Sequence, residues 1–192
     1  MDALTVLQHK PVIHKFWREW FSAYLGREVF QDNNRLFIDH STVFLKYIQY
    51  CTQKQSPCWM TVQSFRKRND VAAIEKLYFD FDSEHDLRKA WVDAVAFAWN
   101  VKQYYKVEPL VCFSGNKGYN VYVWLTNPVE FSSEQQDIAK QFYKTAQTMI
   151  LKGVTYKTLD QNVLGDIKRF SRVPYSIHNK SSNLCVPVSL DH

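Results

Sequence analysis

Residues 74–82 constrain the fold of this chain more than any other segment. They read Ile-Glu-Lys-Leu-Tyr-Phe-Asp-Phe-Asp, an apolar run that ends in two acids. A short apolar run rich in aromatic residues is typical of a buried strand. Alternate side chains of a strand point to opposite faces, so Asp80 and Asp82 project together while Phe81 turns into the core. The segment therefore predicts a strand that presents two carboxylates at its end.

Helical patterns lie on both sides of this strand. Apolar side chains recur at intervals of three and four residues, as on an amphipathic helix. Ser83, with Asp86 three positions on, is a suitable N-cap for one helix, and Ser132 or Ser133 caps another. The expected helices cover residues 11–24, 42–49, 84–105 and 134–151.

Extended segments alternate with these helices. They cover residues 27–38, 58–65, 109–113, 119–125 and 184–188. Helices interspersed with hairpin-like pairs of strands indicate an α+β (mixed α/β) domain. No repeat, linker or charge block divides the 192 residues, so a single domain over residues 1–192 is expected.

Composition excludes several classes of protein. Hydrophobic residues make up 46% and charged residues 22%, which is enough apolar material for a core and excludes a disordered tail. No run reaches the roughly 18 apolar residues of a membrane span, and no apolar signal segment opens the chain. We therefore expect an intracellular protein of the cytoplasm, nucleoid or nucleus, with no membrane partner.

The balance of charge and aromatic residues suits a nucleic-acid partner. The net charge is +5, and the chain holds 13 Phe, 11 Tyr and 6 Trp. Cations pair with phosphates and rings stack on bases. Many ordinary enzymes have the same numbers, so composition alone does not identify a function.

The four cysteines do not form a zinc motif. Cys51 and Cys58 are too far apart for a zinc knuckle, whose paired ligands are roughly two to four residues apart, and no Cys or His pair completes them. Cys112 interrupts an apolar run, as a buried thiol does. We expect these three cysteines and Cys185 to be reduced thiols, and we expect no bound zinc.

A turn with two glycines joins two of the expected strands. Residues 114–118 read Ser-Gly-Asn-Lys-Gly, so the glycines allow close backbone approach and Lys117 adds a positive charge. Such a turn can hold phosphate oxygens on its amides, and an ordinary Asn/Gly-rich hairpin turn explains it as well. The spacing of a P-loop is absent.

Residues 159–180 combine acids with cations. Asp160 or Asp166 could complete a metal site with Asp80 and Asp82, because Mg²⁺ and Mn²⁺ take oxygen ligands. Arginine forks match phosphate oxygens. Solvated acids at a strand end and a solvated basic loop are the alternative interpretations.

Together the three segments resemble the three motifs of the archaeo-eukaryotic primase superfamily. Residues 78–82 are similar to its metal-binding DxD motif, and residues 114–120 to its SGxKGxH motif. Residues 159–180 are similar to the third motif, in which Asp is followed by a basic residue, Pro, Ser, His and Lys. The interval from Asp160 to His178 equals that of primase small subunits.

The resemblance implies an RRM-like antiparallel sheet with flanking helices and an N-terminal α/β unit. It implies a template-directed nucleotidyltransferase, a DNA primase or primase-polymerase, that uses two divalent ions, Mg²⁺ or Mn²⁺. Asp80, Asp82 and Asp160 would be the catalytic metal ligands, with Asp166 as a competing third ligand. The implied nucleotide-binding residues are Ser114, Gly115, Asn116, Lys117, Asn120, Arg172, Ser176, His178 and Lys180.

Asn120 departs from the family pattern, which has His at this position. Asn forms hydrogen bonds but cannot become cationic near neutral pH, so weaker nucleotide binding is expected if the family's His acts by charge.

The partners implied are a single-stranded DNA template and primer, NTPs or dNTPs, and a helicase, accessory primase subunit or fused domain. An end-joining or gap-filling polymerase of the same superfamily and a non-catalytic nucleic-acid-binding subunit are the alternative functions.

Overall fold

The structure is a computed structural model that describes residues 13, 15–17, 20, 26–32, 34–68 and 70–190. The helix expected over residues 11–24 lies largely outside the described residues. Within it, Ile13, Trp17 and Trp20 are helical and buried.

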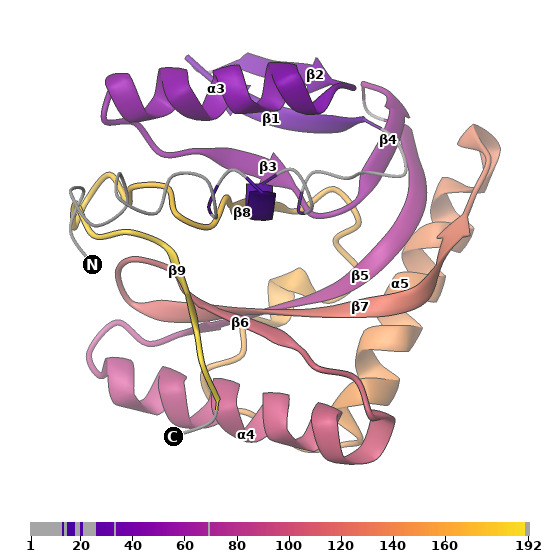
Figure 1. The fold of residues 1–192 in the computed structure, drawn as a ribbon. Coiled ribbons are helices and arrows are strands. Elements are labelled where there is room, and N and C mark those ends of the chain that lie inside the picture. The colour runs from indigo at the N-terminus through magenta and orange to yellow at the C-terminus, as the bar shows by residue number, and fades with distance from the viewer. Residues whose placement is uncertain are drawn as a thin grey trace.

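Two antiparallel sheets form the frame of the molecule (Figure 1). The smaller sheet has the order β2-β1-β3-β8, with the bounds Asn34–Ile38, Arg27–Gln31, Trp59–Thr61 and Phe170–Arg172. The larger sheet has the order β4-β5-β7-β6-β9, with the bounds Ser64–Lys67, Asp70–Asp82, Gly118–Glu130, Leu110–Phe113 and Val186–Val188. This mixture of sheets and helices confirms the expected α+β class.

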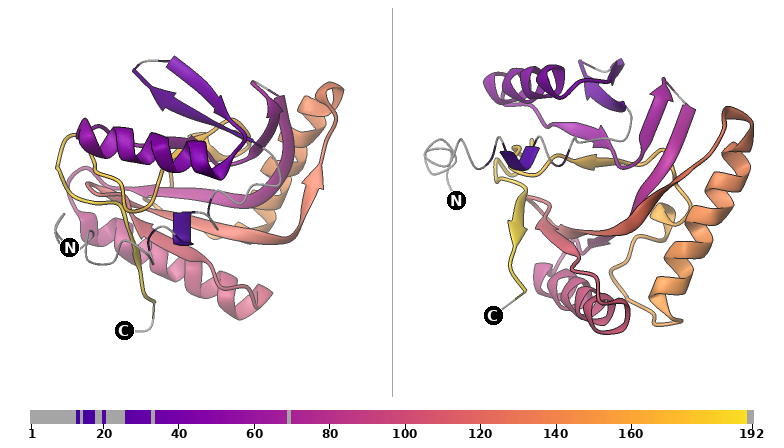
Figure 2. Two further views of the ribbon diagram at one scale, coloured as in Figure 1. Left: turned by 45° about the horizontal axis from the view of Figure 1, so that its top comes forward. Right: turned by 45° about the vertical axis from the view of Figure 1, so that its right-hand side comes forward.

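Three α-helices cover the outer faces of the two sheets. They are α3 (Ser41–Gln53), α4 (Leu87–Tyr105) and α5 (Gln136–Leu151), with short 3₁₀ turns η1 (Ser133–Gln135) and η2 (Gln161–Val163). Helix α3 lies over the smaller sheet, while α4 and α5 pack against β5 and β7 of the larger one (Figures 1 and 2). On the other face of the larger sheet, the helical residue Trp20 packs edge-on against Tyr122 and Trp124 of β7.

Strand β5 is the centre of the core, as its apolar sequence predicts. Phe79 and Phe81 are fully buried, and their rings lie 4.4 and 5.6 Å from that of Phe97 on α4. Because alternate residues face opposite ways, Asp80 and Asp82 are directed away from α4. The predicted inward orientation of Phe81 is confirmed.

Helix α4 begins three residues later than the predicted cap implies. Asp86 is the N-cap, and its carboxylate accepts a hydrogen bond from the Arg88 N–H at 3.0 Å. The Ser83 hydroxyl instead accepts from the Asp86 N–H at 3.2 Å. The Asp86 carboxylate is therefore the group that caps the first helical amides. Ser83 stabilises the turn that precedes the helix.

The strand expected over residues 58–65 is divided between the two sheets. It ends in β3 at Thr61 and resumes in β4 at Ser64, where the chain crosses from one sheet to the other. Gln63 stabilises this crossing: its amide donates to the Lys76 carbonyl at 2.7 Å and accepts from the Glu75 N–H at 3.0 Å. These bonds satisfy a bulge in β5, so the break has a tertiary cause.

A buried ion pair fastens the same crossing. The Arg27 guanidinium contacts the Glu75 carboxylate and donates to the Val62 carbonyl at 2.8 Å. Lys76 lies 3.9 Å from the same carboxylate and is also buried. Charged groups thus connect β1, β5 and the crossing segment inside the molecule.

All four cysteines are free and buried. None of the helices in the described ranges is both long and apolar enough to cross a bilayer.

Candidate active site

A cleft of about 620 Å³ lies between the two sheets and brings the three motif segments together. From the larger sheet it is lined by Tyr78, Asp80, Asp82 and Asn120, and from the hairpin turn by Ser114, Asn116 and Lys117. From the smaller sheet and the third segment it is lined by Arg35, Trp59, Asp166, Lys168, Arg169, Phe170, Arg172, His178, Asn179 and Lys180. The segments are far apart in the sequence, so the fold alone creates this juxtaposition.

Backbone hydrogen bonds place the third acid beside the first two. Leu159 bridges Phe81 in an antiparallel pairing, and the Asp160 N–H donates to the Asp80 carbonyl at 2.8 Å. The segment before η2 thus runs along the end of β5, on the edge opposite β7. This pairing explains why Asp160 lies next to Asp80. Asp160 itself is not among the residues that line the cleft.

Each of the three acids faces a cation from a motif segment. Arg169 lies 3.1 Å from the Asp160 carboxylate and 3.4 Å from that of Asp80. Lys117 lies 3.2 Å from the Asp82 carboxylate and 3.6 Å from that of Glu84. The acids and cations of the site therefore neutralise one another.

Burial, which is the largest cause, and the nearby charges of Asp82 and Asp160 together raise the pKa of Asp80 to about 7 against the opposing effect of Arg169. The hydrogen bond to Asp82 raises the pKa of Lys117. Because burial and the neighbouring acids both disfavour the charged form of Asp80, an added cation would stabilise its carboxylate.

The donor set fits a divalent ion bound together with phosphate. Among the side chains that the structure describes, no three of His, Cys, Asp and Glu already form a metal-ligating cluster. Mg²⁺ is commonly held by one or two carboxylates plus substrate phosphates, and Asp80 and Asp82 meet that need. Arg169 would have to move from Asp80 for an ion to take its place.

The turn of residues 114–118 packs directly on the third segment. Gly115 has φ +94°, and a Cβ atom there would lie 2.8 Å from the Cβ of His178. The Ser181 hydroxyl donates to the Gly115 carbonyl. Within the described chain, the N–H groups of Gly115, Asn116 and Lys117 have no protein acceptor, so they are free to bind an anion.

Asn120 forms a hydrogen bond inside the cleft wall. It is opposite Asp80 in the β5–β7 register, and its carbonyl oxygen accepts from the Tyr78 hydroxyl at 3.0 Å. Burial raises the pKa of Tyr78 well above its ordinary value, so this hydroxyl remains a donor. Asn120 therefore acts here as a neutral hydrogen-bond acceptor.

His178 is held as a neutral imidazole. Its Nδ1 accepts from the N–H groups of Lys180 and Ser181 at 3.2 and 3.4 Å, which assigns the ring proton to Nε2. Burial lowers the pKa of His178, and Arg172 and Lys180 lower it further. The geometry suits a hydrogen-bond donor better than an acid that cycles its proton.

Two other predicted residues have contacts of their own. Arg172 donates to the Ile177 carbonyl at 3.2 Å and stacks on the Trp59 ring, with its guanidinium carbon 4.2 Å from the ring centre. Ser176 donates to the Val173 carbonyl at 2.6 Å and is not among the residues that line the cleft. Asp166 does line it.

The sequence patterns missed several cleft residues. Tyr78 and Arg169 lie inside the motif segments, close in sequence to Asp80 and Asp166. That closeness could have indicated that their side chains enter the cleft. Arg35 and Trp59 belong to no motif and enter the cleft only because the smaller sheet faces β5.

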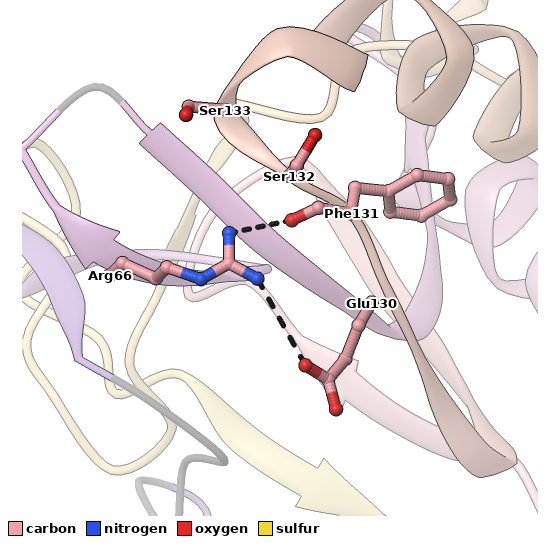
Figure 3. Close-up of a pocket in the computed structure, with 5 residues that line it drawn as sticks. All are labelled: Arg66, Glu130, Phe131, Ser132 and Ser133. Atoms are coloured by element: carbon pink, nitrogen blue, oxygen red, sulfur yellow. Dashed lines mark hydrogen bonds and ion pairs between the residues drawn. The ribbon is translucent and has the colours of Figure 1, made fainter.

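A second hollow of about 400 Å³ lies at the far end of β7. Its Arg66 donates to the Phe131 carbonyl at 2.6 Å and lies 4.0 Å from the Glu130 carboxylate (Figure 3). Ser132 and Ser133 complete the lining. None of these residues belongs to the three motif segments, and Arg66 fastens β4 to the end of β7.

Comparison of sequences identifies no relative: no family profile matches the chain, and neither does any curated protein. Comparison with solved structures, by contrast, finds proteins with a similar fold. The polymerase domain of Mycobacterium tuberculosis ligase D, in complex with DNA, matches with a TM-score of 0.54 at 15% identity, over 87% of this chain and 64% of that one. The archaeo-eukaryotic primase domain of the cyanophage S-2L primase-polymerase matches with a TM-score of 0.54 at 12% identity, over 93% of this chain and 88% of that one.

The fold is that of an archaeo-eukaryotic primase core. This confirms the fold that the resemblance of the motif segments implies. The chain spans somewhat less than two thirds of the ligase D polymerase domain and most of the cyanophage domain. In this primase-type core, the three motif segments occupy one cleft between the sheets.

Proposed function

We propose that the chain is a nucleotidyltransferase that makes or extends nucleic-acid chains on a template from nucleoside triphosphates, as a primase-polymerase does. The observation that carries this proposal is the convergence of three distant segments on one cleft, where acids and cations lie side by side. Acids suit divalent ions, and cations suit phosphates. The primase-type fold supports the same conclusion.

Asp80, Asp82 and Asp160 are the residues that would hold two divalent ions, Mg²⁺ or Mn²⁺. When bound, such ions stabilise the attacking and leaving oxygens of phosphoryl transfer. The protein's own task is to keep the three carboxylates together, and the bond from the Asp160 N–H to the Asp80 carbonyl does this.

The cations and amides beside these acids would bind the triphosphate. Lys117 and the free amides of residues 115–117 present positive and donor groups on the hairpin turn. His178 adds a neutral N–H donor, and Arg169 and Lys180 add positive charge. Positioning and charge provide most of the catalysis in phosphoryl transfer, so the proposal requires no further acid or base.

Incorporation of labelled nucleotides on a primed single-stranded template, with Mn²⁺ or Mg²⁺, tests the proposal. Asp80→Asn and Asp82→Asn should abolish incorporation and leave thermal unfolding intact. Asp137→Asn on the exposed face of α5 is the matched control and should retain activity. Full activity of either cleft variant would contradict the proposed roles.

A gap-filling or end-joining polymerase is the second candidate, and the likeness to the ligase D polymerase domain supports it. The two candidates differ in substrate. Preferred extension at gapped, 5′-phosphorylated ends would favour the second, and chain initiation without a primer would favour the first. Strong DNA binding without metal or triphosphate binding would instead indicate a non-catalytic subunit.

A further inference from the structure

One edge of β5 is paired with β7, and the backbone groups on its other edge have different partners along its length. Strand β4 pairs with the beginning of β5. At the far end, the Asp160 N–H donates to the Asp80 carbonyl at 2.8 Å. Tyr78 lies between these two pairings and is buried. Buried backbone groups are almost always hydrogen-bonded, so Tyr78 requires a partner of its own on this edge.

Helix α5 provides that partner with two of its side chains. The Tyr143 hydroxyl accepts a hydrogen bond from the Tyr78 N–H at 3.1 Å, and the Gln147 side-chain amide donates to the Tyr78 carbonyl at 2.8 Å. Residues four positions apart lie on the same face of a helix, so both side chains reach β5 together. At this position, α5 therefore takes the place of a neighbouring strand.

Gln147 also binds the loop that follows Asp160. Its amide donates to the Val163 carbonyl at 3.3 Å, and its carbonyl oxygen accepts from the Gly165 N–H at 2.8 Å. With the bond to Tyr78, both N–H groups and the oxygen of the side chain are used, all on backbone partners. Gln147 is fully buried. It therefore links β5 to the loop of residues 160–169, which we call the η2 loop.

The η2 loop carries groups of the candidate active site at both of its ends. Asp160 begins the loop, and Arg169, which ends it, lies 3.1 Å from the Asp160 carboxylate. Successive turns connect the two: the Val163 N–H donates to the Asp160 carbonyl at 3.3 Å, and the Arg169 N–H donates to the Asp166 carbonyl at 3.2 Å. Gln147 holds the middle of this series of turns, so it fixes the acid and its cation at the same time.

We propose that Gln147 is a positioning residue of the candidate active site: by tying the η2 loop to β5, it holds the Asp160 carboxylate beside that of Asp80. Gln147 is not among the residues that line the cleft, so it acts through Asp160. The proposal rests on the proposed function, in which these acids hold divalent ions. Groups that orient metal ligands without touching the ion commonly change metal affinity by about 10- to 100-fold.

Calorimetry of Mn²⁺ in the presence of a non-hydrolysable triphosphate tests this role without any turnover. Gln147→Met keeps the length of the side chain and removes all three hydrogen bonds. With the η2 loop released from β5, the Asp160 carboxylate is no longer fixed. Mn²⁺ should therefore bind the variant about 10- to 100-fold more weakly than it binds the wild type.

Gln63→Met is the matched control. Gln63 is also fully buried, and it also forms two hydrogen bonds with the backbone of β5, at Glu75 and Lys76. Both glutamine variants leave buried backbone groups unpaired, so both should lower the free energy of unfolding. Gln63→Met should nevertheless bind Mn²⁺ as the wild type does, because its bonds lie away from the η2 loop.

A double variant separates positioning from a general loosening of the fold. If Gln147 acts through Asp160, the losses of Mn²⁺ affinity in Gln147→Met and Asp160→Asn should not add. Gln147→Met should then cause little further loss in the Asp160→Asn background. If thermal unfolding shows Gln147→Met to be unfolded, Gln147→Asn replaces it, since an amide one carbon shorter cannot span β5 and the loop. Gln63→Asn is its control.

Wild-type Mn²⁺ affinity in the folded Gln147 variant would overturn the proposal, as would an equal loss in the Gln63 variant or fully additive losses in the double variant. Failure of the proposed function gives a different result. If the wild type binds Mn²⁺ and Gln147→Met binds it more weakly, but the wild type incorporates no nucleotide, the proposed function fails and the role of Gln147 stands. Templated incorporation by the wild type with unchanged Mn²⁺ affinity in Gln147→Met would contradict only the role of Gln147.

Discussion

Arg169 holds the Asp80 and Asp160 carboxylates together, and Lys117 does the same for Asp82 and Glu84. These cations come from the segments that would also meet the triphosphate. Under the proposed function, phosphates would attract these cations, and divalent ions would take their place beside the acids. Metal and triphosphate should therefore bind better together than either does alone, since each removes a competitor of the other.

Replacement of Arg169 by Gln tests this exchange at the scale of one residue. With the competing guanidinium gone, Mn²⁺ should bind the free protein about fivefold more tightly, because a partly exposed ion pair contributes up to about 1 kcal/mol. Calorimetry of Mn²⁺ without triphosphate measures the effect, and Arg88→Gln is the control. Equal or weaker Mn²⁺ binding by Arg169→Gln would show that Arg169 organises the acids rather than competing for them.

Gly115 allows a second residue-scale comparison. Its positive φ and its 2.8 Å approach to His178 both disfavour a Cβ atom. Gly115→Ala should lower both stability and triphosphate affinity, because the turn must move off the third segment.

Gly153 provides the matched control, since it has φ +72° but open space around it. Gly153→Ala should lower stability by about 1 kcal/mol, the cost of the backbone alone, and leave triphosphate affinity unchanged. Thermal unfolding and calorimetry separate the two effects. Equal losses in both variants would mean that the contact with His178 is unimportant.

At the scale of elements, β5 combines the acids of the site with a buried charge cluster. Burial, which is the largest cause, and the nearby Arg27 together lower the pKa of Lys76 to about 7, while Glu75 opposes both. Lys76 also lies 4.9 Å above the ring of Trp20 and 5.3 Å above that of Trp124, contacts that favour its charged form. The bulge that turns both Glu75 and Lys76 inward is the structural origin of this cluster.

The lowered pKa of Lys76 predicts a pH dependence of stability. In the unfolded chain this lysine keeps its proton up to about pH 10, whereas in the folded protein it loses it near pH 7. Between these values the unfolded state binds more protons, so stability rises with pH by up to about 1.4 kcal/mol per unit.

Lys76→Met isolates that contribution. Denaturant unfolding of both proteins between pH 7 and 9.5 should show that the stability advantage of the variant shrinks as pH rises. A difference between the two proteins that is constant with pH would contradict a neutral buried Lys76.

The sequence predicted those elements that local patterns determine. The apolar run of β5, the turn at residues 114–118 and the helical stripe of α5 are in their expected places, because periodicity and turn residues act locally. The division of the expected strand 58–65 near Gln63 was not predictable. Its cause is a bulge in β5 at Glu75, which lies twelve residues later in the sequence. For the same reason Arg35 and Trp59 carried no signal, since only the packing of two sheets brings them to the acids.

At the scale of the whole molecule, two sheets face each other across the cleft and divide the chemistry. The larger sheet supplies acids, and the hairpin turn and third segment supply cations. The smaller sheet brings Arg35 and Trp59 into the cleft, so part of the aromatic excess in the composition has a place beside the acids. The proposed function requires metal, triphosphate and template to meet at one point, and the packing of the two sheets brings these groups to one cleft.

Incorporation of each of four labelled nucleotides opposite homopolymer templates tests this account most directly. With Mn²⁺ present, the wild type should incorporate only the nucleotide complementary to the template, and Asp82→Asn should incorporate none. Incorporation that ignores the template, or no incorporation on any primed or unprimed template, would contradict the claim that this cleft performs templated nucleotidyl transfer.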